Sequence, residues 1–238
     1  MKEKNAVGNV KKMFNDLLFL FFPEVCTSCN RVLVTNEKVL CTICKRKLPK
    51  TNYHLWKDNP MEKHFWGRVN FERASAFYYF RKETGVQQLL HQLKYKGRDD
   101  IGVFLGHEYG NELKSKQVTE GIDFIVPVPL HTSRERTRGF NQAYKFGQGI
   151  SEATNIPIRK DFLWRAVASS TQTKKTRFER WKNVGEIFRT KKENELHGKH
   201  LLLVDDVMTT GSTIEACSRA LLNATDVKLS VATIAVAM

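Results

Sequence analysis

Apolar positions along the chain follow two periods, and their alternation predicts an α/β fold. Apolar residues spaced three or four apart predict helices over 83–95 and 101–116, and a third helix from about 142 to 150. The run 201–204 is apolar at every position, which is typical of a strand buried on both faces of a parallel sheet. Three further stretches also predict strands, over 74–80, 123–130 and 227–236. We therefore expect a mostly parallel sheet with helices on both faces and ligands at the carboxyl ends of its strands.

The first 70 residues show no such alternation. They predict a helix or tail at 1–22, a small cysteine-bearing module at 23–50 and an aromatic connecting segment at 51–70, followed by the α/β domain at 71–238. The apolar run 17–22 is far shorter than the ~20 residues of a membrane helix, and no small-residue cleavage site follows it. These features predict a cytoplasmic protein without a stable membrane span.

Four of the five cysteines form two CxxC pairs within nineteen residues, namely Cys26 with Cys29 and Cys41 with Cys44. Two such pairs can place four thiolates at the corners of a tetrahedron, as structural zinc requires. Disulfides need an oxidising compartment, and a redox CxxC is usually single; an iron–sulfur cluster fits the ligands but suits the spacing less well. The spacing therefore predicts a zinc site that folds this module, with no open position for catalysis.

The net charge of +14 is unevenly distributed and indicates an anionic partner. Residues 1–50 carry 10 basic and 4 acidic side chains, residues 131–192 carry 15 and 5, and the last 46 carry 3 and 6. Nucleic acid, a phosphorylated small molecule or a membrane surface fits this excess, and so does a merely solvated helix face. The basic residues that we consider for nucleic-acid binding are Arg134, Arg136, Arg138, Lys45, Arg46 and Lys47.

The most informative stretch follows the apolar run at 201–204. Asp205 and Asp206 come at the carboxyl end of this predicted strand, and a polar turn, TTGST, leads from them into a predicted helix. A strand, a tight polar turn and a helix aim backbone N–H groups and hydroxyls at one point, which is a phosphate site. Two carboxylates beside a phosphate need another partner, such as sugar hydroxyls or Mg²⁺. The combination predicts a site for a ribose that carries a 5′-phosphate.

The residues VDDVMTTGST at 204–213 resemble the phosphoribosyl pyrophosphate (PRPP) motif of type I phosphoribosyltransferases. In that family the paired acids hold the ribose hydroxyls and the following loop holds the 5′-phosphate. The resemblance implies the first role for Asp205 and Asp206. It implies the second role for Thr209, Thr210, Gly211, Ser212 and Thr213.

Other blocks narrow the resemblance to the competence protein F (ComF) family. The double CxxC, PVPL at 127–130, RGFNQ at 138–142 and the PRPP motif occur in that order along nearly the whole chain. The resemblance implies that Pro129, Leu130, His131 and Thr132 contact the pyrophosphate, with Arg138 close by. It also implies that a mobile loop at about 171–183 closes over the ligand, with contacts from Lys174, Lys175 and Arg177. The alternative is that these cations face nucleic acid instead.

Three functions fit these features. The first is a DNA-uptake accessory protein of natural transformation. It handles incoming single-stranded DNA beside a helicase-like ATPase, and binds PRPP or a nucleotide in its pocket. The second is an active Mg²⁺-dependent phosphoribosyltransferase with an unknown acceptor, and the third is a zinc-bearing adaptor without ligand binding. No residue is assigned a catalytic role, and nothing in the sequence identifies an acceptor.

Overall fold

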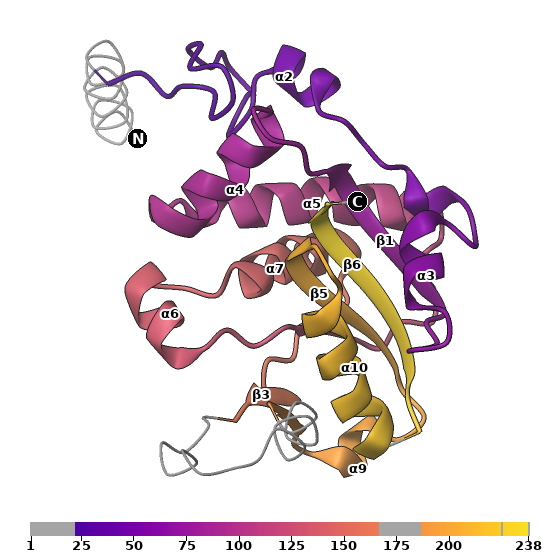
Figure 1. The fold of residues 1–238 in the computed structure, drawn as a ribbon. Coiled ribbons are helices and arrows are strands. Elements are labelled where there is room, and N and C mark those ends of the chain that lie inside the picture. Colours follow the sequence, from indigo (N-terminus) through magenta and orange to yellow (C-terminus); the bar gives the residue numbers. More distant parts are fainter. Residues whose placement is uncertain (1–21, 167–186, 225, 238) are drawn as a thin grey trace, which may run out of the picture. The chain divides into compact units, whose positions relative to one another are not determined.

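The structure is a computed structural model and describes residues 22–166, 187–224 and 226–237 (Figure 1). The chain divides after Leu48 into two compact units. In the first unit, the described residues form loops joined by a β-bridge between Val25 and Val32, followed by the helix α2 (Thr42–Lys47). The second unit holds the sheet and its helices. None of the helices in the described part of the chain has the length and apolar composition of a membrane span.

A four-stranded parallel sheet forms the centre of the second unit. Its strands β1 (Arg73–Tyr79), β2 (Phe124–Pro127), β5 (His200–Met208) and β6 (Lys228–Val236) lie in the order β1-β6-β5-β2. The predicted mostly parallel sheet is therefore confirmed. Because all four strands run in the same direction, their carboxyl ends meet at one edge of the sheet.

Two strand ends differ from the sequence prediction. The strand predicted at 123–130 ends at Pro127. Val128 still donates its N–H to the Val204 carbonyl at 2.9 Å, but Pro129 has no N–H and so cannot continue the pairing. The strand predicted at 201–204 continues to Met208, because its backbone stays paired with β6 as far as Val236. The two aspartates therefore lie within the paired part of β5, near its carboxyl end, and not after the strand.

Helices cover both faces of the sheet, α10 on one and α7 on the other (Figure 1). The predicted helices are confirmed within a few residues as α4 (Gly85–Tyr95), α5 (Asp99–Ser115) and α7 (Gln142–Thr154). The other helices of this unit in the described residues are η1 (Tyr53–Leu55), α3 (Pro60–Phe65), α6 (Thr132–Arg138), α9 (Glu193–Leu196) and α10 (Ser212–Ala224). Two short strands, β3 (Leu163–Arg165) and β4 (Phe188–Thr190), form a separate antiparallel pair.

Short segments cover both edges of the sheet. Residues 49–51 pair antiparallel with the end of β1, where Thr51 donates its N–H to the Phe77 carbonyl at 3.1 Å. On the far edge, Ile125 of β2 donates to the Pro157 carbonyl at 2.9 Å and accepts from the Arg159 N–H at 2.8 Å. The backbone groups of the edge strands are thereby partly satisfied within the chain, which limits pairing with other chains.

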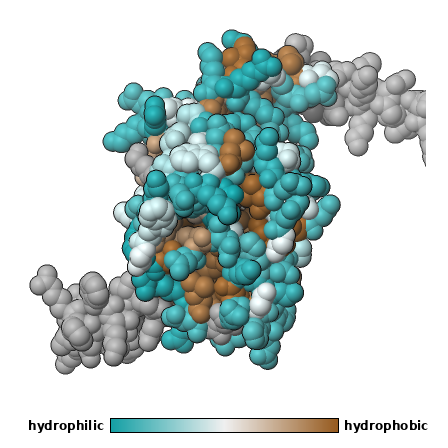
Figure 2. Space-filling view, turned by 90° about the vertical axis from the view of Figure 1, so that its right-hand side faces the viewer, coloured by the Kyte–Doolittle hydropathy of each residue, from teal (hydrophilic) through white to brown (hydrophobic). Residues whose placement is uncertain are grey.

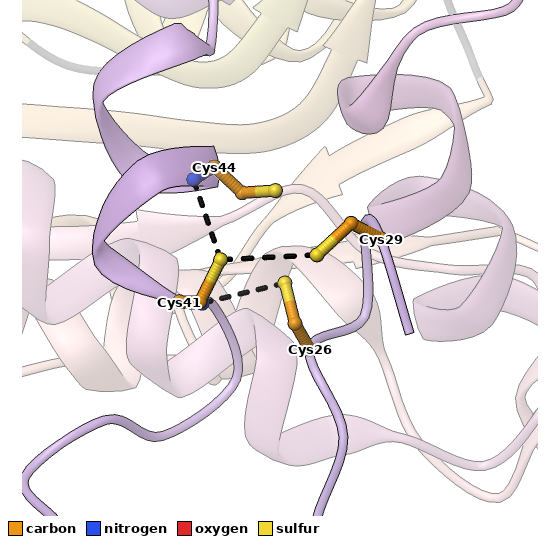
Figure 3. A group of neighbouring side chains, drawn as sticks. All are labelled: Cys26, Cys29, Cys41 and Cys44. Atoms are coloured by element: carbon orange, nitrogen blue, oxygen red, sulfur yellow. Dashed lines mark hydrogen bonds between the residues drawn. The ribbon is translucent and has the colours of Figure 1, made fainter. Parts of the chain in front are cut away.

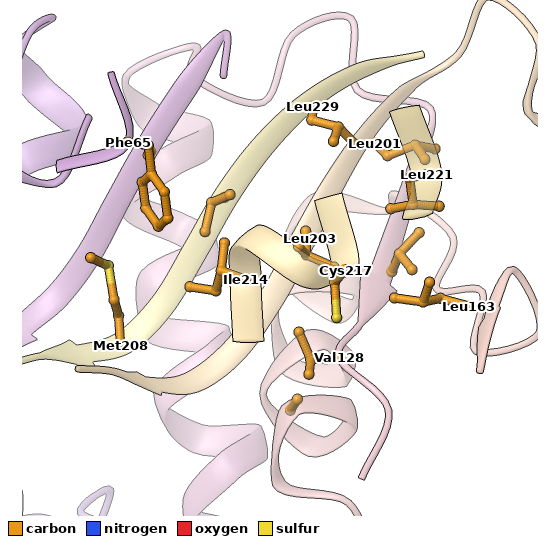
Figure 4. Close-up of a cluster of buried hydrophobic side chains, with 14 of the residues drawn as sticks. Phe65, Val128, Leu163, Leu201, Leu203, Met208, Ile214, Cys217, Leu221 and Leu229 are labelled. Atoms are coloured by element: carbon orange, nitrogen blue, oxygen red, sulfur yellow. The ribbon is translucent and has the colours of Figure 1, made fainter. Parts of the chain in front are cut away.

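The core between the sheet and α10 consists of interlocking apolar side chains (Figure 4). Ile214, Cys217 and Leu221 recur at helical spacing on α10 and face Leu201 and Leu203 of β5. All five are almost completely buried. The outer surface, in contrast, is mostly hydrophilic. Figure 2 shows the face that includes α3, on which hydrophobic patches are separated by hydrophilic side chains. The α10 core therefore fixes the helix start next to the end of β5.

The helices α5 and α7 lie in direct backbone contact on the other face. Gly106 and Gly149 permit this approach, because a Cβ on Gly106 would lie 2.0 Å from the Phe146 carbonyl oxygen, and one on Gly149 would lie 2.0 Å from the Val103 oxygen. Gly102 and Gly110 continue the same strip along α5 at intervals of four residues. The glycines of these two segments therefore serve helix packing.

Candidate functional site

The four cysteines of the two CxxC pairs converge on one point in the first unit (Figure 3). Their Sγ atoms all lie within 4.8 Å of one another, and those of Cys29 and Cys41 are 3.8 Å apart. Cys41 caps the start of α2, since its Sγ accepts the Cys44 N–H, so that the helix places both of its cysteines on the same side. All five cysteines of the chain lie in described residues, and none of them forms a disulfide.

This geometry fits a tetrahedral zinc ion. Four Zn–S bonds of ~2.3 Å in a tetrahedron separate the sulfurs by about 3.8 Å, and the observed spacing is close to that value. Burial raises the pKa of Cys26, but backbone N–H donors from Cys41, Ser28 and Cys29 outweigh it and lower the pKa to about 7. One thiolate is thus available near neutral pH to begin metal binding. The cluster can hold a metal such as zinc, with all four positions taken by protein.

The second site begins at the carboxyl end of β5. Asp205 and Asp206 lie there side by side, both only partly exposed, and the Asp206 N–H donates to Asp205 Oδ1 at 2.8 Å. Burial, followed by the charge of Asp206, raises the pKa of Asp205 to about 8. The Asp206 carboxylate forms an ion pair with Lys94 of α4, with Oδ2 and Nζ 3.0 Å apart. Although adjacent in sequence, the two acids therefore have different electrostatic surroundings.

The loop between β5 and α10 follows the acids directly. Thr209, Thr210, Ser212 and Thr213 are exposed, and Gly211 adopts a left-handed conformation with φ of +72°. The hydroxyls of Thr210 and Ser212 lie 3.0 Å apart. The turn thus brings hydroxyls together with the N–H groups of the first turn of α10.

Residues of the connecting segment at 51–70 contact this loop and the start of α10. These contacts are not predicted from the sequence. His64 Nε2 lies 3.0 Å from the Thr210 carbonyl oxygen, and the Phe65 ring occupies the space next to Gly211, where a Cβ would come within 2.9 Å of it. Arg68 Nη1 donates to Glu215 of α10 at 3.1 Å. We interpret His64 from the sequence as a packing or surface residue. Its position at the loop depends on a contact between residues 146 apart, which no local pattern reveals.

The loop after β2 lies beside the acids, because β2 and β5 are neighbours in register. Pro129, Leu130 and His131 are partly exposed in it, and Thr132 begins α6. Arg138 ends α6, donates to Gln142 Oε1 at 2.9 Å and lies over the Tyr95 ring, 5.5 Å from its centre. The sequence-predicted pyrophosphate residues thus lie at the same sheet edge as the acid pair.

The remaining predicted residues fall into three groups. Arg134 and Arg136 are exposed on α6, and Lys45, Arg46 and Lys47 are exposed at the end of α2 in the first unit. Lys174, Lys175 and Arg177, with the rest of the predicted closing loop, lie outside the described residues. The structure therefore places the acid pair, the phosphate turn and the loop after β2 together.

Comparisons with known proteins identify the domain and relatives of the chain. The sequence-family model described as "Phosphoribosyl transferase domain" matches residues 142–238. The chain is 32% identical over 202 residues to the "DNA utilization protein YhgH" of Escherichia coli K12, covering 83% of this chain and 84% of that protein. It is 26% identical to "Competence protein ComFC" of Bacillus subtilis, covering 86% and 81% of the two chains.

Solved structures with similar folds include a glutamine PRPP amidotransferase of B. subtilis. The match has a TM-score of 0.41 and 19% identity, and covers 59% of this chain and 30% of that one. With the domain match, the parallel sheet and the four-cysteine cluster, the fold is α/β of the phosphoribosyltransferase kind with a small N-terminal metal-binding module.

Proposed function

Because the chain belongs to the ComF family, we propose that it serves the uptake or utilisation of DNA, handles single-stranded DNA in the cytoplasm and binds PRPP or a nucleotide. Relatives that carry the names "DNA utilization protein" and "Competence protein" support the first part. The ligand and the form of the DNA are inferred from the residues of this chain. The expected helicase-like ATPase partner rests on the family resemblance alone.

The observation that carries the ligand assignment is the order of groups along the sheet edge. The acid pair lies at the end of β5, directly before the hydroxyl-bearing turn that leads into α10. The loop after β2 begins on the neighbouring strand, where the Val128 N–H bonds the Val204 carbonyl. A ribose with its hydroxyls on the acids has its 5′-carbon on one side and its C1 on the other. PRPP carries a phosphate at the first and a pyrophosphate at the second, so its three parts correspond to the three groups.

Mg²⁺ fits this site as part of the ligand. Asp205 and Asp206 offer the oxygen ligands that Mg²⁺ accepts, and PRPP supplies the remaining oxygens. When bound, the ion neutralises charge on the pyrophosphate. The protein itself orients the ribose through the two carboxylates and holds the 5′-phosphate with the turn at 209–213.

Exposed cations and aromatic rings support single-stranded DNA as the second ligand. Arg134 and Arg136 project from α6 into solvent. Trp66 is 60% exposed, with Lys63 Nζ 5.8 Å from its ring centre, and Lys191 Nζ lies 4.9 Å from the ring of Trp164. Cations that follow the phosphates and rings that stack on bases give binding with little sequence preference.

The first experiment tests the pocket by calorimetry with PRPP and Mg²⁺. Replacing both acids (Asp205→Asn with Asp206→Asn) should weaken PRPP binding about 100-fold or more, because the contacts of both carboxyl groups with the ribose hydroxyls are lost. Single-stranded DNA binding should be retained by the same variant. Asp226→Asn, an exposed acid outside the site, is the matched control. Unchanged PRPP affinity in the double variant would remove the pocket assignment.

The DNA assignment is tested in the same preparation through its salt dependence. Reversing two charges on α6 (Arg134→Glu with Arg136→Glu) should lower the slope of log K against log salt by about 1.4, since each phosphate contact contributes about 0.7 on single strands. Lys116→Glu with Lys228→Glu, two exposed lysines on other elements, is the control. A slope that stays the same in the α6 variant moves the DNA surface to another element, such as the end of α2.

One observation favours transfer chemistry in addition to binding. The pKa of about 8 allows the Asp205 carboxyl to exchange a proton near neutral pH. In a transfer, C1 of the ribose bonds to the acceptor, pyrophosphate leaves with the electrons of the C1–O bond, and the acceptor loses a proton. Release of pyrophosphate from PRPP, measured with single-stranded DNA and with free bases as acceptors, tests this second function.

A further inference from the structure

Lys94 is a charged residue of the ribose site that no sequence motif marks. It lies in the last turn of α4, a helix whose position is fixed by the buried side chains of Val86, Leu89, Leu90 and Leu93. Its Nζ atom is 3.0 Å from Asp206 Oδ2. The two side chains are only 23% and 15% exposed, so water screens this pair less than it screens a surface ion pair.

The pair balances an unfavourable concentration of negative charge. Asp205 and Asp206 are adjacent and shielded from water, and the raised pKa of Asp205 reflects that burial and the neighbouring carboxylate. Lys94 acts in the opposite direction and lowers the pKa of Asp205. Among the residues that the structure describes, Lys94 is the ion-pair partner of Asp206. Its ammonium group is therefore bound to the same carboxylate that we propose as the acceptor of a ribose hydroxyl.

A ribose that binds Asp206 competes with Lys94 for the same oxygen atoms. In PRPP the pyrophosphate is attached to C1, next to the hydroxyl-bearing C2. An ammonium group released from the carboxylate therefore has pyrophosphate oxygens within the reach of a lysine side chain. A buried ammonium requires an anionic partner, and the pyrophosphate supplies one.

The surroundings of α4 place its end at the correct side of the site. Tyr95, the next residue, lies beneath the guanidinium of Arg138, at the end of the helix that follows the loop after β2. That loop starts next to β5, where the Val128 N–H bonds the Val204 carbonyl at 2.9 Å. The end of α4 is thus adjacent both to the acid that orients the ribose and to the region that we assign to the pyrophosphate.

We infer that Lys94 is a PRPP-binding residue that exchanges the Asp206 carboxylate for the ligand's pyrophosphate and so favours PRPP over a sugar monophosphate. This inference rests on the proposed PRPP pocket. Ribose 5-phosphate offers the same hydroxyls and the same 5′-phosphate but no pyrophosphate. It must therefore displace Lys94 from Asp206 without giving it a new partner, whereas PRPP restores the ion pair.

Calorimetry of wild-type protein and of Lys94→Met, with PRPP and with ribose 5-phosphate in the presence of Mg²⁺, tests the inference. Loss of one charge-assisted contact should weaken PRPP binding about 10-fold or more. Binding of ribose 5-phosphate should stay the same or become tighter, because Asp206 no longer has to be freed. Lys94→Arg, which keeps the charge, should retain the preference for PRPP, and Lys96→Met, an exposed lysine two residues away, should resemble the wild type.

The ratio of the two affinities separates a binding role from a structural one. A general disturbance of the site weakens both ligands alike, and that result would overturn the inference, as would an unchanged ratio. If Lys94→Met does not fold, as judged by thermal unfolding, Lys94→Gln provides the same comparison with a polar side chain. A wild-type protein that binds neither ligand overturns the pocket itself. A wild type that binds PRPP while the variants keep its preference overturns only the role of Lys94.

Discussion

Asp205 and Asp206 show how much two neighbouring residues of the same type can differ. The charge of Asp205 acts on Cys217 of α10, and burial followed by this charge raises the pKa of the Cys217 thiol. Asp206 instead pairs with Lys94 of α4. The raised pKa of Asp205 favours its neutral form near neutral pH, whereas Asp206 lies in an ion pair. In a ribose site a neutral carboxyl group can donate a hydrogen bond to a hydroxyl as well as accept one.

His54 is a second residue whose surroundings decide its charge. It is buried against the ring of Tyr109, and its Nε2 atom is 3.9 Å from Glu112; its Nδ1 atom has no hydrogen-bond partner among the residues that the structure describes. Burial lowers the pKa of His54, although Glu112 opposes the shift. From the sequence we interpret His54 as a packing or surface residue, because four cysteines already complete a metal site, and the structure shows that it is buried.

The lowered pKa predicts a loss of stability in acid. Since the unfolded chain then binds a proton that folded His54 resists, the free energy of unfolding should fall as the pH decreases below about 6.5. Each unit of lowered pKa corresponds to about 1.4 kcal/mol of this loss. Urea unfolding at pH 7 and pH 5 should show a smaller decrease for His54→Gln than for the wild type. The exposed His91→Gln serves as control, and equal decreases in all three proteins would contradict the assignment.

At the scale of elements, the contact between α5 and α7 positions the site. The amino end of α7 follows α6, and Asn141 caps it by accepting the N–H groups of Ala143 and Tyr144. The Asn141 side chain also donates to the Val128 carbonyl at 2.9 Å, which ties the helix to the end of β2. Because α7 packs on α5 through glycines, a change in their spacing should alter the whole sheet edge.

Gly106→Ala should therefore destabilise the protein. Alanine favours a helix over glycine by about 1 kcal/mol, but its Cβ would lie 2.0 Å from the Phe146 oxygen, a backbone atom that cannot move alone. Overpacking of this kind costs about 1–3 kcal/mol or more, so we expect a net loss of about 2 kcal/mol in chemical denaturation. Asn111→Ala, at an exposed position of the same helix, should stay within about 0.5 kcal/mol of the wild type. A Gly106→Ala variant as stable as the wild type would show that the two helices can separate.

At the scale of the whole molecule, the chain consists of two units with different sources of stability. The second unit has a continuous apolar core around its sheet. In the first, the described residues form little regular structure besides α2, and the four cysteines are the feature that joins its loops. A segment of about 30 residues buries too little apolar surface to fold alone, so we expect a metal held by the four cysteines to supply the missing free energy.

Removal of the metal should accordingly affect the two units differently. Purified protein should contain about one zinc ion per chain, and Cys41→Ser or a strong chelator should release it. Hydrogen exchange should then become fast in peptides from 23–48 and stay slow in β5 and β6. Ser28→Ala, between two of the cysteines, should keep the metal because it removes no thiolate. A purified wild type with four free thiols and no metal would contradict the zinc assignment.

The sequence by itself determined the features that depend on neighbouring residues. The period of apolar positions gives the strands and helices, the CxxC spacing gives the cysteine cluster, and the order of acids, turn and helix at 205–213 gives the proposed ribose phosphate site. These patterns can be read directly because a strand, a helix turn or a metal knuckle is formed by residues close together in the chain. The resemblance to the ComF family rests on the same local blocks.

Only the tertiary structure decided which distant residues complete the site. Lys94 reaches Asp206 and His64 reaches Thr210 because α4 and α3 are held at the carboxyl edge of the sheet by their buried faces. In the sequence, each is one polar residue among many on an amphipathic or irregular segment. The position of such a side chain is set by the packing of whole elements, whose burial energy far exceeds that of a single contact, and periodicity along the chain does not encode it.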